Sequence, residues 1–419
     1  MPLLNLAALF ITITALFSWF NHRFIRLPAT IGVMVIALVM SLVLIGLNHA
    51  GFADVTDHAR YWLEQVNFNA LLMDGMLSFL LFAGALHVDL AQLRRYRWSI
   101  GLLATCGVMI STLVVGTAAW WLFAALGTDI PWLWCLVMGA LLAPTDPIAV
   151  LGIMRSAGAP DDMEIRIVGE SLFNDGVAVV VFSTLLGAAT AGDALTAGHV
   201  GMLFLQEAGG GIVLGVAIGA LVYALMKSID QHQVEVLLSL ALVVGGYALA
   251  SQLHLSGPIA MVVAGLIIGN MARSGAMSHN TRTYVDGFWE LIDEILNAVL
   301  FVLIGLELLL IPFQLNYLWV ALPLIAIMLV TRLATIGVPL TLLRRWLGFR
   351  RGTTRVLTWG GLRGGISVAL ALGLPQTDWR EPIVMITYIV VLFSILVQGL
   401  SIGRVVRHLL DKDKRTKSP

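Results

Sequence analysis

Long runs of hydrophobic residues recur along the whole 419-residue chain, separated by short polar connections. Each run holds about 20 residues, the length that a helix rising about 1.5 Å per residue needs to cross a hydrocarbon core of roughly 30 Å. The pattern predicts an all-α polytopic membrane protein with about thirteen transmembrane helices. We expect them at residues 4–20, 29–46, 69–88, 98–125, 132–155, 166–189, 201–227, 233–252, 257–272, 288–312, 315–340, 355–374 and 382–403.

The composition supports this prediction. Only 12% of the residues are charged and 59% are hydrophobic, whereas an ordinary soluble domain has roughly 25% charged residues. The lipid bilayer is therefore the expected surrounding of the chain, and a nucleic-acid partner is not expected.

The basic residues give the orientation, because Lys and Arg accumulate in cytoplasmic connections. Connections after even-numbered helices hold only Arg60 and Arg380, whereas those after odd-numbered helices are rich in basic residues. The basic residues assigned to these odd-numbered connections include Arg94, Arg95, Arg97 and Arg166. We expect the N-terminus outside, the C-terminus inside, and a short basic cytoplasmic tail at residues 404–419.

Two predicted helices contain residues that interrupt a helix. The fifth contains "APTDP", in which Pro144 and Pro147 remove backbone donors on either side of Thr145 and Asp146, and the twelfth contains "GGLRGG" around Arg363. The two helices are seven apart, so they cross the membrane in opposite directions. This arrangement predicts two inverted-topology repeats, helices one to six and eight to thirteen, joined by helix 201–227.

Polar residues converge at one depth of the predicted bundle. Asp146, Asp175, Arg332 and Arg363 each lie about eight or nine residues from the cytoplasmic end of a different helix, or roughly 12 to 14 Å. An ionised Asp at a helix centre costs about 2.5 to 3.5 kcal/mol on insertion scales, so such residues mark ion paths, proton relays or internal pairs. A packing salt bridge explains one isolated acid, but not the whole group.

The sixth helix carries four of these polar side chains on one stripe: Glu170, Ser171, Asn174 and Asp175. Carboxylate, carbonyl and hydroxyl oxygens are the ligands of small hard cations. We predict that Asp146 and Asp175 supply charge, and that neutral oxygens come from the Ser171 hydroxyl, the Asn174 amide and the Thr145 carbonyl. Burial favours a protonated Asp175 when no cation is bound, so proton and cation would compete for one site.

Glu170 has a different predicted role, as the partner of a buried arginine. A buried arginine is permanently charged and requires an acidic partner. Arg363 is one candidate partner for Glu170 and Arg332 is the competing one. Their spacing in the sequence does not choose between them.

Three further polar residues, Asp293, Glu294 and Asn297, lie a turn or two inside the cytoplasmic end of the tenth helix. They predict an acidic funnel that concentrates cations. A solvated helix end explains them equally well.

The sequence resembles a known family through three motifs: "APTDP", "GESLFND" and "GGLRGG". These motifs, in this order and in these helices, are similar to those of the NhaP-type sodium/proton antiporters, a group that includes the animal sodium/proton exchangers. The resemblance implies one transmembrane antiporter domain at residues 1–403 of a multi-pass plasma-membrane protein, the inner membrane in a bacterium. It has a core (about 98–189 and 315–403) and a dimerisation part (about 1–97 and 233–312).

The resemblance also implies roles for individual residues. Asp175 would carry the cation or the proton, with Asp146, Ser171 and the Thr145 backbone as further ligands. Glu170 would lie close by and Asn174 would steady the site. Arg363 falls on the family's structural arginine, and Arg332 on a second one.

The expected activity is exchange of sodium, and of lithium, for protons by alternating access, serving pH and sodium homeostasis in a homodimer. An asparagine before the aspartate, at position 174, is associated with electroneutral exchange of one cation for one proton. The same oxygen set also suits potassium, because selectivity depends on cavity size. A cation channel is a remote alternative. Neither "GxSxG" nor "HExxH" occurs, so neither an enzyme nor a cofactor is expected.

Overall fold

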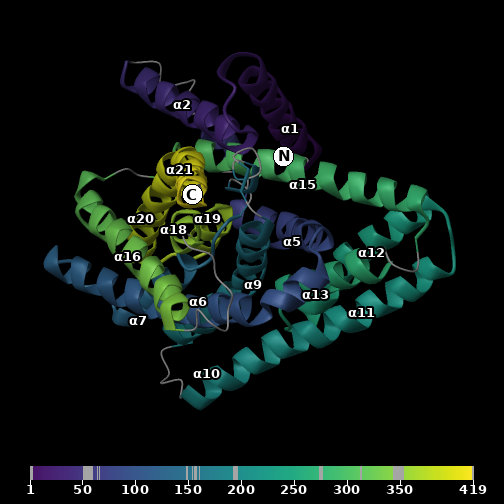
Figure 1. Ribbon diagram of the computed structural model, residues 1–419. Helices are drawn as coiled ribbons and strands as arrows, with labels where there is room; N and C mark the ends of the chain where they lie inside the picture. The colour runs from purple at the N-terminus through teal and green to yellow at the C-terminus, as the bar shows by residue number, and fades with distance from the viewer. Residues whose placement is uncertain are drawn as a thin grey trace.

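The structure is a computed structural model of the whole chain. It describes residues 3–50, 60–63, 65, 67–147, 150–152, 154, 158–159, 161–191, 197–272, 277–311, 314–342 and 353–417. Within these ranges all regular secondary structure is helical, and the one β-type contact is an isolated β-bridge. The all-α prediction is confirmed (Figure 1).

The first half of the chain forms helices α1 (Leu3–Phe20), α2 (Ala29–His49), α4 (Phe68–Ala70), α5 (Leu77–Leu86), α6 (Leu90–Ala125), α7 (Trp132–Leu141), α9 (Asp161–Ala191) and α10 (Ala197–Phe204). The second half forms α11 (Gly210–Lys227), α12 (His232–Gln252), α13 (Gly257–Ile267), α15 (His279–Glu307), α16 (Leu318–Leu342), α18 (Thr353–Trp359), α19 (Gly365–Leu372), α20 (Arg380–Phe393) and α21 (Leu400–Lys417). Short π-helical or 3-10 segments η1 to η6 adjoin them at Asn21–Ile25, Leu71–Met76, Leu205–Gly209, Ile268–Ala272, Leu315–Tyr317 and Ser394–Gly399.

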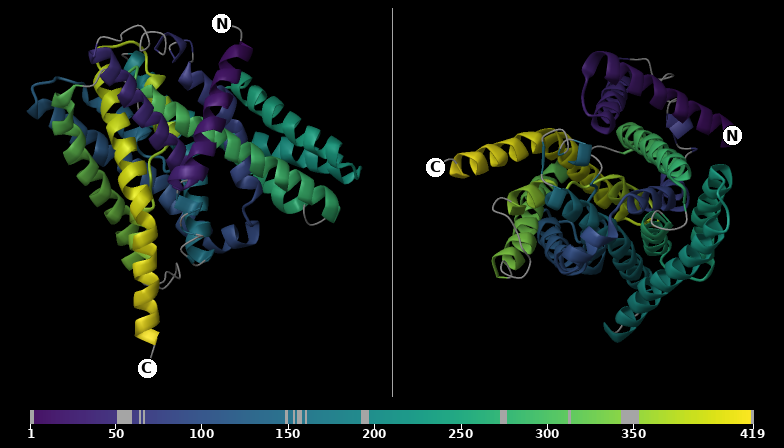
Figure 2. Two further views of the ribbon diagram at one scale, coloured as in Figure 1. Left: turned by 90° about the horizontal axis from the view of Figure 1, so that it is seen from above. Right: turned by 45° about the vertical axis from the view of Figure 1, so that its right-hand side comes forward.

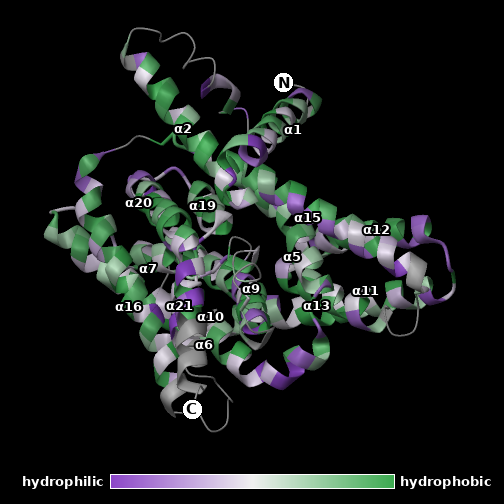
Figure 3. Ribbon diagram, turned by 45° about the horizontal axis from the view of Figure 1, so that its top comes forward, coloured by the Kyte–Doolittle hydropathy of each residue, from purple (hydrophilic) through white to green (hydrophobic). Residues whose placement is uncertain are grey.

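Each of the thirteen predicted ranges contains helix. By length and composition, nine helical stretches of the described residues are long and apolar enough to cross a membrane. Figure 3 shows hydrophobic colouring along the long helices. Large apolar side chains lie exposed on them, as on α11 (Val213, 69%) and α16 (Leu322, 60%). Such a surface suits contact with lipid tails. The number of crossings and their direction remain predictions.

Hydropathy placed one helix start too late and one helix end too early. Residues 90–97, expected in a connection, form the first two turns of the 36-residue α6, which Asp89 caps by accepting from the N–H groups of Ala91 and Gln92. The 404–419 tail likewise continues the helix α21 as far as Lys417 (Figure 2). Hydropathy marks where a helix leaves the hydrocarbon, whereas hydrogen bonding decides where the helix ends.

Both predicted interruptions are present. Helix α7 ends at Leu141, and α18 ends at Trp359 before α19 begins at Gly365. The two non-helical segments cross, because Asp146 and Leu362 form an isolated antiparallel bridge in which the Asp146 N–H donates to the Leu362 carbonyl at 2.8 Å. Backbone groups that the breaks free from helical pairing are thus partly paired with each other.

Helix α9 runs through the middle of the molecule. It packs against α6 and α7 on one side and against α13 on the other, and Figure 1 shows α11 and α12 beyond α13, opposite the group of α6, α7 and α16. Helices α6 and α7 touch at backbone distance, since a Cβ on Gly139 would meet the Thr112 carbonyl oxygen. The contact of α9 with α7, in turn, places the polar stripe of α9 directly beside the broken end of α7.

Candidate cation site at the crossing of two broken helices

Arg363 lies at the crossing and bonds to backbone rather than to a carboxylate. Its guanidinium donates to the carbonyl of Ala143 and, at 2.8 Å, to that of Pro144, and its own N–H donates to Ser394 Oγ at 2.9 Å. The two carbonyls belong to the end of α7, where helical partners are missing and the helix dipole favours a cation. Arg363, only 3% exposed, therefore holds the two interruptions together.

Glu170 on α9 pairs with Arg332 on α16. Of the two candidate arginines, the structure thus places Arg332 on the carboxylate and Arg363 on the carbonyls. Glu170 is fully buried, and the Arg332 side chain is 12% exposed. The pair also depends on a glycine, because a Cβ on Gly361 would lie 2.6 Å from Arg332 Nε.

A buried hydrogen-bond network joins Thr145, in the non-helical segment after α7, to Ser171 and Asn174 of α9. Asn174 Oδ1 accepts from the Thr145 N–H at 3.3 Å while its Nδ2 donates to Thr145 Oγ1 at 2.8 Å, and the hydroxyls of Thr145 and Ser171 lie 2.9 Å apart. The Asn174 amide is engaged at both ends, so it fixes the broken segment. The Thr145 side chain and N–H, which the sequence did not assign a role, carry this network.

Asp146 and Asp175 face a cavity of about 1010 Å³ that opens to the surface, and Thr145 also lines it. Asp175 is 6% exposed, and Asp146 is half-buried. Space for the Asp146 carboxylate exists because residue 364 is a glycine, since a Cβ there would collide with that carboxylate. Glu170, Ser171 and Asn174 are not among the cavity's lining residues. The predicted residues therefore fall into a set that lines the cavity and a set behind it.

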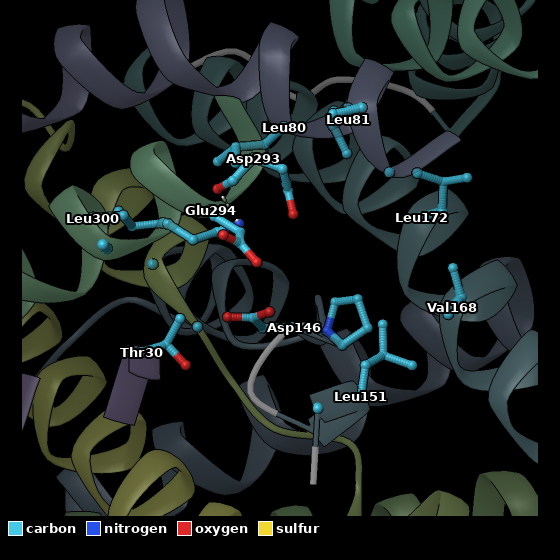
Figure 4. Close-up of a pocket in the computed structure, with 18 of the residues that line it drawn as sticks. Thr30, Leu80, Leu81, Asp146, Leu151, Val168, Leu172, Asp293, Glu294 and Leu300 are labelled. Atoms are coloured by element: carbon cyan, nitrogen blue, oxygen red, sulfur yellow. Dashed lines mark hydrogen bonds between the residues drawn. The ribbon is translucent and has the colours of Figure 1, made fainter. Parts of the chain in front are cut away.

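The predicted funnel residues line the same cavity. In Figure 4, Asp293 and Glu294 from α15 and Asp146 from the broken segment point toward the same space. Glu294 is exposed, whereas Asn297 is 1% exposed and donates to the Asp293 carbonyl at 2.8 Å. The alternative of a solvated helix end is wrong, because α15 begins at His279 and all three residues lie near its middle, where they line the cavity.

Acids that the sequence did not single out line this cavity as well, namely Asp89, Glu164 and Glu290. Asp89 and Glu290 are exposed. Asp89 precedes α6, Glu164 lies in the first turn of α9 and Glu290 lies inside α15, so no spacing along the chain relates them. Only the tertiary structure brings these acids to one opening.

Arg166 is a third buried arginine, although the sequence placed it in a connection. It lies in α9 at 1% exposure, with its guanidinium 4.1 Å from the centre of the Tyr96 ring and its Nη1 3.4 Å from Ser99 Oγ. One signal was available, since residues 166, 170 and 174 are spaced by four and share a helix face. Arg166 therefore joins α9 to α6, one helical turn before Glu170 and its ion pair.

Two broken helices cross inside a bundle of apolar helices, and carboxylates at the crossing face a cavity. This arrangement defines a membrane transporter of the kind built on interrupted helices. The comparisons with known proteins specify this class. Residues 10–408 match the family described as "Sodium/hydrogen exchanger, transmembrane". The chain belongs to that family, as the resemblance predicted, and it is thus a transporter.

Proteins that are similar to this chain over nearly its whole length support the family assignment. The Na(+)/H(+) antiporter NhaP of Pseudomonas aeruginosa is 56% identical over 411 residues, which cover 97% of either chain. The Na(+)/H(+) antiporter NhaH of Halobacillus dabanensis is 36% identical over 380 residues, covering 89% of this chain and 91% of that one. The sodium proton antiporter MjNhaP1 of Methanocaldococcus jannaschii has the same fold, with a TM-score of 0.73 at 20% identity over 98% of this chain and 100% of that one.

Proposed function

We propose that this chain exchanges sodium, and also lithium, for protons across a membrane. The observation that carries the proposal is the placement of Asp146 and Asp175 in one cavity at the helix crossing. The names of the relatives as Na(+)/H(+) antiporters support the same activity.

The exchange follows from the repulsion between two carboxylates that face one space. A cation bound between them, or a proton on one of them, relieves the repulsion. Because Asp175 is the more deeply buried of the two, we assign to it the proton that the cation displaces. Asp146 and the Thr145 backbone complete the ligand set, and Ser171 supplies a further hydroxyl oxygen when the cation is bound.

The remaining charges at the crossing are fixed. Glu170 is neutralised by Arg332, and Arg363 is held by carbonyl oxygens. Asn174 stands beside Asp175 in place of a second acid and is committed to Thr145. One exchangeable negative charge at Asp175 supports electroneutral exchange of one cation for one proton.

Alternating access is the mechanism that we propose for the two parts of the bundle. The core (about 98–189 and 315–403) would move against the dimerisation part (about 1–97 and 233–312) of a homodimer, with helix 201–227 as the linker. We propose thirteen crossings in two inverted repeats, with the N-terminus outside, the C-terminus in the cytoplasm and residues 404–419 as a basic tail. The location would be the plasma membrane, a bacterial inner membrane, where exchange would serve pH and sodium homeostasis.

The positions of the exposed acids support our proposal that the cavity opens to the cytoplasm. Asp89 and Glu290 lie near the chain segments rich in arginine that we assign to the cytoplasm. With Asp293, Glu294 and Asn297 they form the acidic funnel, which attracts cations to the cavity at low ionic strength.

The test is proton flux in proteoliposomes that contain a pH-sensitive dye, titrated with sodium, lithium and potassium. We expect a sodium and lithium response that Asp175→Asn abolishes while the protein remains folded. The matched control is Asp129→Asn, which removes an exposed acid outside the cavity. A response to potassium alone would establish a potassium/proton antiporter, and undiminished exchange by Asp175→Asn would refute the assigned role.

A further inference from the structure

Helix α19 has the cation site at one end and an unusual contact at the other. Its first residues adjoin Asp146, because a Cβ on Gly364 would meet that carboxylate. At its last turn, the Asn69 side chain of α4 donates to the Ala369 carbonyl at 2.8 Å. Ala369 follows Gly364 by five residues, so the two contacts lie about 7.5 Å apart along a single 8-residue helix.

The contact of Asn69 joins the two parts of the bundle that the proposed mechanism moves apart. Asn69 belongs to the proposed dimerisation part and α19 to the core. The fit is close, since a Cβ on Gly373 would collide with the Asn69 amide. A second bond joins the same two parts, from the Tyr388 hydroxyl of α20 to the Ile304 carbonyl of α15 at 2.8 Å.

These two bonds lie away from the cavity. The third predicted helix lines the cavity from Leu77 onward, whereas Leu72 and Met76, one and two turns after Asn69, are buried at 1% and 4% exposure. The bundle is therefore open at the end with the arginine-rich segments and packed shut at the end where Asn69 and Tyr388 lie.

From this geometry we infer that Asn69 and Tyr388 are positioning residues that hold the transporter closed on the external side. Their bonds form only in the arrangement that opens the cavity to the cytoplasm, and both break whenever α19 and α20 move relative to α4 and α15. Loss of either bond shifts the equilibrium toward the outward-open arrangement. The inference rests on the proposed alternating access.

The experiment measures access rather than flux. In a background without Cys106 and Cys135, the reporters are Met76→Cys for the external side and Thr30→Cys, in the cavity lining, for the cytoplasmic side. The full-length protein in vesicles of known orientation is treated with a charged, impermeant methanethiosulfonate. Asn69→Leu should raise the labelling rate of Met76→Cys from outside by roughly three- to tenfold and lower that of Thr30→Cys from inside.

Two further variants keep the test decisive. Tyr388→Phe deletes one hydroxyl with little risk to folding, and it should shift labelling in the same direction. Asn270→Leu is the matched control, because the Asn270 side chain bonds to Val88 and Leu90 within the proposed dimerisation part alone. Unchanged labelling in both Asn69→Leu and Tyr388→Phe, or an equal shift in Asn270→Leu, would overturn the inference. Failure of exchange itself is detected separately, by the flux of the unmodified chain and Asp175→Asn.

Discussion

Arg332 and Arg363 approach the same polar cluster from different helices, yet they make different kinds of bond. Arg332 on α16 meets the carboxylate of Glu170, whereas Arg363 meets the carbonyls of Ala143 and Pro144. One arginine neutralises a charge and the other replaces missing helical hydrogen bonds. The comparison shows that a buried cation in a membrane protein can be required by a broken backbone as much as by an acid.

The largest stability loss is expected from breaking the ion pair. Arg332→Ala leaves Glu170 charged and buried, which should lower the free energy of unfolding by about 3–5 kcal/mol. Equilibrium unfolding in mixed micelles, followed by the fluorescence of the 12 tryptophans, measures it. Adding Glu170→Gln removes the unpaired charge, so the double variant should recover a large part of the loss. No recovery would mean that the pair is not the reason for the instability.

A smaller loss is expected at the other arginine. Arg363→Leu leaves two buried carbonyls without their donor and should cost about 2–3 kcal/mol in the same unfolding measurement. Here Glu170→Gln should bring no recovery, since Glu170 keeps its partner Arg332. If Glu170→Gln rescued both arginine variants equally, the distinction between the two arginines would be wrong.

The smallest effect is expected one bond further from the charges. Ser394 Oγ accepts from the Arg363 N–H at 2.9 Å and donates to Gln398 Oε1 at 2.8 Å. Ser394→Ala removes both bonds and should lower the free energy of unfolding by about 1 kcal/mol. Ser228→Ala, which removes an exposed hydroxyl bonded within its own helix, should have no measurable effect.

Much of the candidate site could be predicted because charges are rare inside apolar helices. Asp146, Asp175, Glu170 and both arginines stand out from their surroundings in the sequence, and Pro144 and Pro147 mark the break. Arg166 was missed for the opposite reason: it lies near a helix end, where an arginine is ordinarily solvated. Hydropathy cannot distinguish a basic residue in water from one that stacks on Tyr96 inside the bundle.

The sequence by itself determined the all-helical class, the two interruptions and the identity of the polar residues. These depend on local properties: hydrophobic length, the missing N–H of proline and the cost of charge in hydrocarbon. Only the tertiary structure decided that Arg332 pairs with Glu170, that the breaks cross at Asp146 and Leu362, and which acids share one cavity. Those outcomes depend on the relative rotation and depth of helices far apart in the chain, which no local pattern specifies.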